Sequence, residues 1–541
     1  YDTDSAPTMA QQLRSLYVAS QCGYLCAAGD VDSEDYDRPG VERIVQNVLG
    51  RLEESGSNVV VMHDAGGDRG QTVQALAKLI PALRQKGYTF VTLADLLGTS
   101  RDALMPQLAG AEQALVAGDR ALSWLANWGW WLLMKLFLVT TGFALFRSAL
   151  LGVLVYARSR RKLPQATDKF TPPVLVLIPA YNEEKVIRRT LDAVLQSDYP
   201  NFRVLVVDDG SADQTTHIVA DVARSHGQVE WLSKPNGGKF SALNRGLRDA
   251  WEEYIVTIDA DTIILPDTIR HLVAPFADAA VDAVCGNVQV GNRNGLLTRF
   301  QDVEYVTSQN YDRRAFDAAN CIPVVPGATG AWRRRTVLRA GGYSRDTLTE
   351  DADLTLTLLR HGAKIVYQPL ARSITEAPKD TKALLRQRFR WGYGTLQSLW
   401  KHRGHFGCGS VGWIGLPNLL LFQIIFPALA PLSLVVLLVS AIRGAWLLPL
   451  LWFGVFVAVD LTGAAVAFRL EKRGLKDLWV VMAQRFYYRP FMYVVTLRSL
   501  LAAVAGRRHG WNKLERHGSV QLDVTIRHPM GWDLPEPAAS H

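Results

Sequence analysis

The chain has 541 residues, of which 48% are hydrophobic and 20% charged, and its formal net charge is +8. This length is too great for one ordinary domain and is sufficient for two or three. The sequence contains no basic stripe interleaved with aromatic residues, which argues against a nucleic-acid-binding protein, and none of the five cysteines forms a CxxC pair, which argues against zinc knuckles.

Residues 1–100 have the pattern of part of an α/β domain, and residues 101–121 form a polar, alanine-rich linker. Within the first segment, "NVVVMHDAGGDRGQT" (58–72) predicts a buried strand that carries His63 into a loop. Cys22 and Cys26 could form a disulfide outside the cytoplasm or remain two unpaired small residues.

Residues 122–157 predict a transmembrane helix, because their apolar run exceeds the roughly 20 residues that a span needs. Trp128, Trp130 and Trp131 would lie at one interface of the membrane. The basic run "RSRRK" (158–162) follows immediately. Since positive charge collects on the cytoplasmic side, we expect the chain after this span to be cytoplasmic and residues 1–100 to be extracytoplasmic.

Residues 172–400 alternate between short apolar runs and helical patterns, which predicts an α/β domain with a parallel sheet covered on both faces. The predicted strands are "VLVLIP", "RVLVVDD", "VEWLS", "YIVTID", "DAVCGNVQV" and "AKIVYQ". Ligands of such sheets bind beyond the carboxyl ends of the strands, so the polar residues that end these runs are the candidate site residues.

Acidic motifs end several of these runs: "IPAYNEE" (178–184), "VVDDGSAD" (206–213) and "IDADT" (258–262). Further along lie "LTEDADL" (348–354) and "QRFRW" (387–391). Asp259 and Asp261 offer the hard oxygen ligands that Mg²⁺ or Mn²⁺ prefers beside a diphosphate. Each motif alone could be an ordinary turn or helix start, but their occurrence in order across one domain favours a nucleotide-dependent site.

Residues 411–505 predict a second membrane region with spans at 413–441 and 445–468. Residues 475–505 are interrupted by "QRFYYRP" and could be an interfacial helix followed by a short span, so the number of C-terminal spans stays open at two or three. The tail, residues 506–541, is basic and argues for a cytoplasmic C-terminus, whereas a count of four spans places it outside.

The motifs "PAYNEE", "VDDGS", "NGGKFSALN", "DAD", "TED" and "QRFRW" resemble those of family 2 glycosyltransferases with a GT-A (Rossmann-like) fold, over residues 172–400. The resemblance is to the processive membrane synthases of cellulose, chitin, hyaluronan and poly-N-acetylglucosamine. It implies an enzyme that transfers sugar from a UDP-sugar to a growing polysaccharide, with inversion to a β-linkage and with Mg²⁺ or Mn²⁺ as cofactor.

The same resemblance implies roles for individual residues. Asp351, with Glu350 beside it, would be the general base that deprotonates the acceptor hydroxyl. The expected nucleotide-sugar ligands are Tyr181, Glu183, Asp208, Asp209, Lys239 and Asp259, the expected metal ligands are Asp261 and Asp259, and the residues expected over the diphosphate and the acceptor are Gln387, Arg390 and Trp391.

Three segments, "GWNKLERHG" (510–518), "RFYYRPFMYVV" (485–495) and "VVPGATGAWRR" (324–334), look most similar to the poly-β-N-acetylglucosamine synthases. UDP-N-acetylglucosamine is therefore the expected donor. Chitin-, hyaluronan- or cellulose-type synthesis and transfer to a lipid carrier remain alternatives, and the oligomeric state is not predicted. The expected location is the inner membrane, in contact with lipid.

Residues 1–100 resemble the C-terminal half of a NodB-type polysaccharide deacetylase, through "GDVDSEDYDRPG" (29–40), the strand before His63, and "LIPALRQKGYTFVTLADLL" (79–97). Such enzymes hold a metal with an aspartate and an HxxxH pair early in the domain, and no histidine precedes His63 here. Since metal hydrolysis needs several ligands and an open position, we expect Asp32 and His63 to be family positions without a complete deacetylase site.

Overall fold

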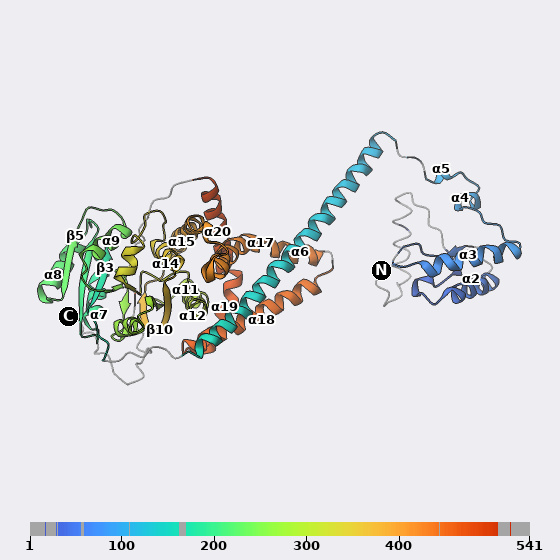
Figure 1. Cartoon of the computed structure of the whole chain (residues 1–541). Coiled ribbons are helices and arrows are strands. Elements are labelled where there is room, and N and C mark those ends of the chain that lie inside the picture. The colour runs from blue at the N-terminus through green and yellow to red at the C-terminus, as the bar shows by residue number, and fades with distance from the viewer. Residues whose placement is uncertain are drawn as a thin grey trace. The chain divides into compact units, whose positions relative to one another are not determined.

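The computed structural model describes most of the chain, in two compact units, Tyr1–Ser123 and Trp124–His541 (Figure 1). The described residues are 17, 29, 31–55, 59–65, 67–105, 107, 109–161, 169–442, 444–506 and 520. Cys22, Cys26 and the segment 510–518 lie outside them, so the structure does not address the predictions made on these residues.

The first unit contains a two-stranded parallel sheet packed against two helices. Its elements are β1 (Val31–Asp32), η1 (Asp35–Asp37), α2 (Val41–Ser55), β2 (Val60–Val61), α3 (Gly70–Gln85), α4 (Leu93–Leu96) and α5 (Arg101–Leu104). Val31, Val48 and Leu79 form its core. The strand predicted before His63 is present as β2, which pairs with β1. It is only two residues long and half-buried, so the prediction of a buried strand is wrong.

A single helix, α6 (Ala111–Ser159), contains the predicted first span. The predicted linker is helical from residue 111, which agrees with the high helix propensity of its alanines. Phe143 of α6 lies beside Phe426, with the ring centroids 6.1 Å apart.

The second unit is built on a sheet that has eight strands among the described residues, in the order β5-β4-β3-β6-β9-β8-β10-β7. The strands are β3 (Val174–Ala180), β4 (Phe202–Asp208), β5 (Val229–Ser233), β6 (Tyr254–Thr257), β7 (Ile263–Ile264), β8 (Val281–Val290), β9 (Gly330–Arg333) and β10 (Lys364–Thr375). The six predicted runs are confirmed as strands. The prediction of a parallel sheet is confirmed for the pairs β3–β4, β3–β6, β4–β5 and β8–β10. It is wrong for the rest, because the unpredicted β9 pairs antiparallel with both β6 and β8, and β7 pairs antiparallel with β10.

Helices connect and follow these strands. They are α7 (Ile187–Leu195), α8 (Thr215–Ser225), α9 (Lys239–Asp249), α10 (Thr268–Val273), α11 (Leu296–Glu304), α12 (Tyr311–Ala318), α13 (Arg334–Arg339), α14 (Glu350–Arg360) and α15 (Thr381–Lys401). A π-helical segment, η3 (Tyr305–Asn310), joins α11 to α12.

Both faces of the sheet are covered, as predicted, and successive residues of β3 enter different cores. Leu175 and Leu177 pack in one core with residues of α9 and α14. Val174, Val176 and Ile178 pack in the other core with residues of α7 and α8. This alternation is the period of two expected of a strand with both sides buried.

Three helices are long and apolar enough to cross a membrane by length and composition: Ala111–Ser159, Val411–Ile442 and Pro449–Leu470. The second ends in α17 (Phe426–Ile442), and the third lies in α18 (Leu447–Leu470). These three segments overlap the spans predicted at 122–157, 413–441 and 445–468.

The ambiguous segment 475–505 is divided between η7 (Leu475–Asp477), α19 (Leu478–Phe486) and α20 (Tyr488–Val504). Tyr487 separates α19 from α20. Pro490 lies in the first turn of α20, where its missing N–H leaves no helical hydrogen bond unmade. The break at Tyr487 therefore precedes the proline, and α20 includes Pro490 at a position that a helix tolerates.

Candidate functional site

The predicted site residues follow strands whose carboxyl ends meet at one edge of the sheet. β3 runs parallel to β4 and to β6, so Tyr181, Asp209 and Asp259 leave the sheet at the same edge. α9 begins at Lys239 and α14 begins at Glu350. The topology thus gathers residues that are up to about 170 positions apart in sequence.

These residues line one cavity of about 1760 Å³. The cavity continues between α6, α17, α18, α19 and α20, where apolar and aromatic side chains dominate its lining. One space therefore connects the polar edge of the sheet to the apolar helices. Every predicted site residue except Asp208 lines it, namely Tyr181, Glu183, Asp209, Lys239, Asp259, Asp261, Glu350, Asp351, Gln387, Arg390 and Trp391.

The two aspartates of "VDDGS" point in different directions. Asp208 accepts hydrogen bonds from the hydroxyls of Ser211 (2.5 Å), Thr216 (2.6 Å) and Ser233 (3.2 Å). These donors lie in the loop after β4, in α8 and at the end of β5. Since these bonds occupy its carboxylate and it does not line the cavity, Asp208 shapes the loop that carries its neighbour.

Asp209 faces the cavity and is held by the glycine-rich loop before α9. Its carboxylate accepts hydrogen bonds from the backbone N–H groups of Gly237 (3.0 Å) and Gly238 (2.7 Å), and it forms an ion pair with Lys234. Gly210 follows with φ of 78°, and a Cβ there would lie 2.9 Å from the backbone nitrogen of Asn236. This turn therefore requires glycine.

A lysine lies within the acidic cluster. Lys239 Nζ is 2.6 Å from Asp259 Oδ1 and 3.3 Å from Glu350 Oε1. Burial lowers the pKa of Lys239, but the negative charges of Asp259, Glu350 and Asp351 outweigh it, and the pKa is raised overall. Lys239 is therefore a permanent cation within this cluster.

Asp351 has the properties of a proton acceptor. Burial raises its pKa above the usual aspartate value, and the adjacent charge of Glu350 raises it further, while Lys239 opposes both effects. Its Oδ2 accepts a hydrogen bond from the backbone N–H of Gly327 at 3.3 Å. A carboxylate with a raised pKa is a better base than an ordinary one.

Gly327 is a site residue that the motif analysis did not single out. A Cβ at this position would lie 2.6 Å from Lys239 Nζ and 3.1 Å from Asp259 Oδ1. Its loop lies between β8 and β9 in the chain and also lines the cavity through Pro326 and Ala328. Only its occurrence in "VVPGATG" could have pointed to it, because the close approach depends on residues far away in sequence.

Helix α15 carries the "QRFRW" residues and is packed tightly on two sides. A Cβ at Gly392 would lie 3.0 Å from Ser499 Oγ of α20, and one at Gly394 would lie 2.6 Å from the side chain of Thr349, directly before α14. Gln387 is 6% exposed, and its Oε1 has no hydrogen-bond partner in the described part of the chain. This helix therefore links the acidic cluster to α20.

The donor set fits a hard divalent cation that is held jointly with a ligand. Asp259 and Asp261 both line the cavity and provide carboxylate oxygens, which are the ligands that Mg²⁺ and Mn²⁺ prefer. Among the described residues, no group of three or more His, Cys, Asp or Glu is placed to hold a metal by itself. A diphosphate would have to supply the remaining ligands, as is usual for Mg²⁺ at phosphate sites.

In the first unit, His63 is paired with Asp35, a residue that was not among the positions predicted from the sequence. His63 Nδ1 lies 2.7 Å from Asp35 Oδ1, and Asp35 also accepts hydrogen bonds from Thr72 (2.8 Å) and Ser33 (3.0 Å). Burial raises the pKa of Asp35, but these hydrogen bonds lower it well below the usual value. Tyr36 packs edge-on against the His63 ring, 5.5 Å between centroids.

Asp32, the other predicted position, accepts a hydrogen bond from the backbone N–H of Glu34 (2.9 Å) and so stabilises the loop. No metal-binding cluster of three ligands includes it or His63 within the described residues. The resemblance of this unit to a deacetylase remains a prediction.

Comparison with known proteins gives a family match for part of the second unit. Residues 172–394 match the family described as "Glycosyltransferase like family 2". The poly-beta-1,6-N-acetyl-D-glucosamine synthase of Staphylococcus aureus (strain COL) is 29% identical over 237 residues, 44% of this chain and 58% of the relative. The synthase of the same name from Staphylococcus epidermidis is 28% identical over the same length. The chain thus matches 58% of the length of these relatives.

A solved structure has a similar fold. It is the mannosyltransferase PcManGT from Pyrobaculum calidifontis in complex with GDP-Man and Mn²⁺, with a TM-score of 0.50 and 21% identity, over 70% of this chain and 99% of the other. At this level of identity the likeness concerns the fold, which is the mixed α/β fold with a glycosyltransferase-type sheet. Residues 172–394 are therefore a domain of the glycosyltransferase-like family 2 type.

Proposed function

We propose that this protein is a processive, inverting glycosyltransferase that polymerises N-acetylglucosamine from UDP-N-acetylglucosamine into a β-linked polysaccharide. The similarity to the staphylococcal synthases supports the choice of sugar. The observation that carries the proposal is the single cavity that runs from the acidic cluster to the apolar helices. A polymerase that exports its product needs such a continuous space.

The nucleotide end of the site would be formed by Tyr181, Glu183 and Asp209. Asp209 is oriented by two backbone N–H groups and so presents a fixed acceptor to a uridine. Lys239 would supply positive charge next to the phosphates. Asp208, bonded within its own loop, would act by holding Asp209 in place.

Asp259 and Asp261 would hold Mg²⁺ or Mn²⁺ at the diphosphate. A metal bound there would neutralise charge that builds up on the leaving diphosphate. Arg390 and Gln387 lie on α15, which follows Asp351 in the chain, and they line the same cavity. Arg390 would stabilise the departing UDP, since a guanidinium matches phosphate oxygens.

Asp351 would act as general base. It accepts the proton of the acceptor hydroxyl while the hydroxyl oxygen attacks the anomeric carbon from the face opposite the nucleotide. The bond between that carbon and the diphosphate oxygen breaks, and UDP leaves with the electron pair. A single displacement converts an α-linked donor into a β-linkage. Trp391 would stack on the acceptor sugar and help to place it in line.

The three candidate spans support a multi-pass protein of the inner membrane. The basic run after the first span supports a cytoplasmic transferase domain, with the first unit on the opposite side of the membrane. The first unit would then lie on the side where the polymer emerges.

The test is to incubate the purified protein in detergent with a panel of UDP-sugars and Mg²⁺ or Mn²⁺, and to read UDP release, product mass and linkage. We expect long N-acetylglucosamine chains. Release of UDP only from a UDP-sugar other than UDP-N-acetylglucosamine would indicate a synthase of a different polysaccharide. Addition of a single sugar would indicate a non-processive transferase. Failure to release UDP from any sugar would refute a transferase function.

A further inference from the structure

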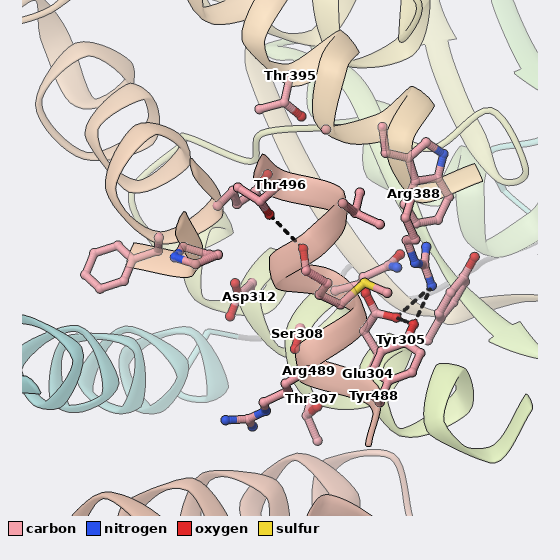
Figure 2. Close-up of a pocket in the computed structure, with 18 of the residues that line it drawn as sticks. Glu304, Tyr305, Thr307, Ser308, Asp312, Arg388, Thr395, Tyr488, Arg489 and Thr496 are labelled. Atoms are coloured by element: carbon pink, nitrogen blue, oxygen red, sulfur yellow. Dashed lines mark hydrogen bonds and ion pairs between the residues drawn. The ribbon is translucent and has the colours of Figure 1, made fainter. Parts of the chain in front are cut away.

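A polar cluster of one half-buried and two buried side chains, outside the acidic site, joins three helices of the second unit. Arg388 of α15 donates to Glu304 Oε2 at the end of α11 (2.6 Å), and Tyr488 at the start of α20 donates to the same oxygen (2.6 Å). Arg388 is also 3.3 Å from the Tyr488 hydroxyl. Figure 2 shows these three side chains converging at one side of the cavity, with dashed lines between them.

The guanidinium of Arg388 lies on the ring of Trp391, one helical turn further along α15. Its central carbon is 4.1 Å from the ring centroid, within the range of a cation–π contact. Trp391 also packs against an apolar cluster that includes Val288, Tyr305 and Ala328. The position of the indole therefore depends on the Arg388 guanidinium as well as on its apolar neighbours.

The orientation of Arg388 depends on its two partners. Arg388 is 5% exposed, and its Nε and Nη1 have no hydrogen-bond partner in the described part of the chain. Glu304 balances its charge, and Tyr488 fixes the position of the Glu304 carboxylate. A lysine ammonium keeps the positive charge but is not planar, so it cannot stack on the indole as the guanidinium does.

We propose that Glu304, Arg388 and Tyr488 form a positioning network that sets the tilt of the Trp391 ring and thereby places the acceptor sugar. The proposal rests on the proposed function, in which Trp391 contacts the acceptor. None of the three residues needs to touch the substrate. They act through Trp391, and they connect its orientation to α20, which packs against α17.

The test compares R388K and Y488F with the wild type in two reactions of UDP-N-acetylglucosamine. The first is transfer to N-acetylglucosamine oligomers, and the second is hydrolysis of the donor without an acceptor. Since a misplacement of about 1 Å can cost about a hundredfold in rate, we expect transfer to fall about ten- to a hundredfold and products to shorten. Donor hydrolysis and the donor KM should stay within about twofold of the wild type.

A double-mutant cycle with W391A separates positioning from a general structural role. In the W391A background, R388K should cause no further loss of transfer, because the residue through which it acts is already gone. A matched control is R473K, which alters the ion pair between Arg473 and Asp302 of the same helix α11 (2.7 Å). This control should leave product length unchanged.

The proposal is overturned if both variants keep wild-type transfer and product length. It is equally overturned if transfer and donor hydrolysis fall by the same factor, or if R388K lowers transfer as much in W391A as in the wild type. Thermal unfolding in detergent identifies a variant that fails to fold. If R388K fails to fold, the transfer rate of Y488F, which keeps the aromatic ring and loses only the hydroxyl, decides the test. A wild type that releases no UDP would refute the proposed function instead.

Discussion

The substitution Gly327→Ala tests whether the loop before β9 belongs to the active site. The new Cβ would lie 2.6 Å from Lys239 Nζ, and an ordinary contact begins at 3.4 Å, so the ammonium and the loop must separate by about 0.8 Å. Lys239 cannot move without changing its 2.6 Å contact with Asp259. Overpacking of this kind costs about 1–3 kcal/mol.

If the same 1–3 kcal/mol is lost at the transition state, kcat/KM falls about five- to 160-fold. The assay is UDP release from UDP-N-acetylglucosamine by the purified chain. Gly227→Ala is the matched control, because a Cβ at Gly227 meets no atom within 4 Å, and it should retain full activity. If Gly327→Ala were as active as this control, Gly327 would not be part of the site.

Four further outcomes are expected. Asp351→Asn should abolish polymerisation while UDP still binds, as measured by calorimetry; normal polymerisation would disprove the role as base. Because burial and Glu350 raise the pKa of Asp351, kcat/KM should fall as the pH is lowered, with a midpoint above the usual value of 3.8; a midpoint at or below 3.8 would contradict this. Removal of divalent cations with EDTA should stop UDP release, and Mg²⁺ or Mn²⁺ should restore it; unchanged activity would exclude a metal at Asp259. Asp35→Asn should destabilise the first unit by about 1–3 kcal/mol, seen as faster hydrogen exchange in residues 31–85 of the full chain, and unchanged exchange would mean that the pairing with His63 is dispensable.

The strands and the placement of the candidate site residues along one cavity could be predicted from the sequence because both depend on local patterns. Apolar runs of five to nine residues identified the six confirmed strands, and acids at their ends marked the edge where the cavity lies. The membrane segments were predictable for the same reason, since length and apolarity suffice.

What the sequence did not predict depends on contacts between distant residues. β9 has four residues and no pattern of its own, and its antiparallel direction follows from its place between β6 and β8. Gly327 and Asp35 were missed because their importance comes from Lys239 and His63, which are 88 and 28 positions away. The different orientations of Asp208 and Asp209 likewise emerge only when Ser233 and Gly238 are folded beside them.

The two glycines of α15 have a mechanical consequence. Gly392 and Gly394 are two positions apart, which places them about 200° apart around a helix, so Ser499 and Thr349 press on nearly opposite sides of α15. The backbone of α15 is therefore approached closely on both sides, which leaves little room for the helix to shift sideways. A displacement of α20 would therefore be transmitted through α15 to Thr349, two residues before Asp351. Since α20 packs against α17, a change in the thickness of the hydrocarbon layer around α17 would reach Asp351, the proposed general base, along this route.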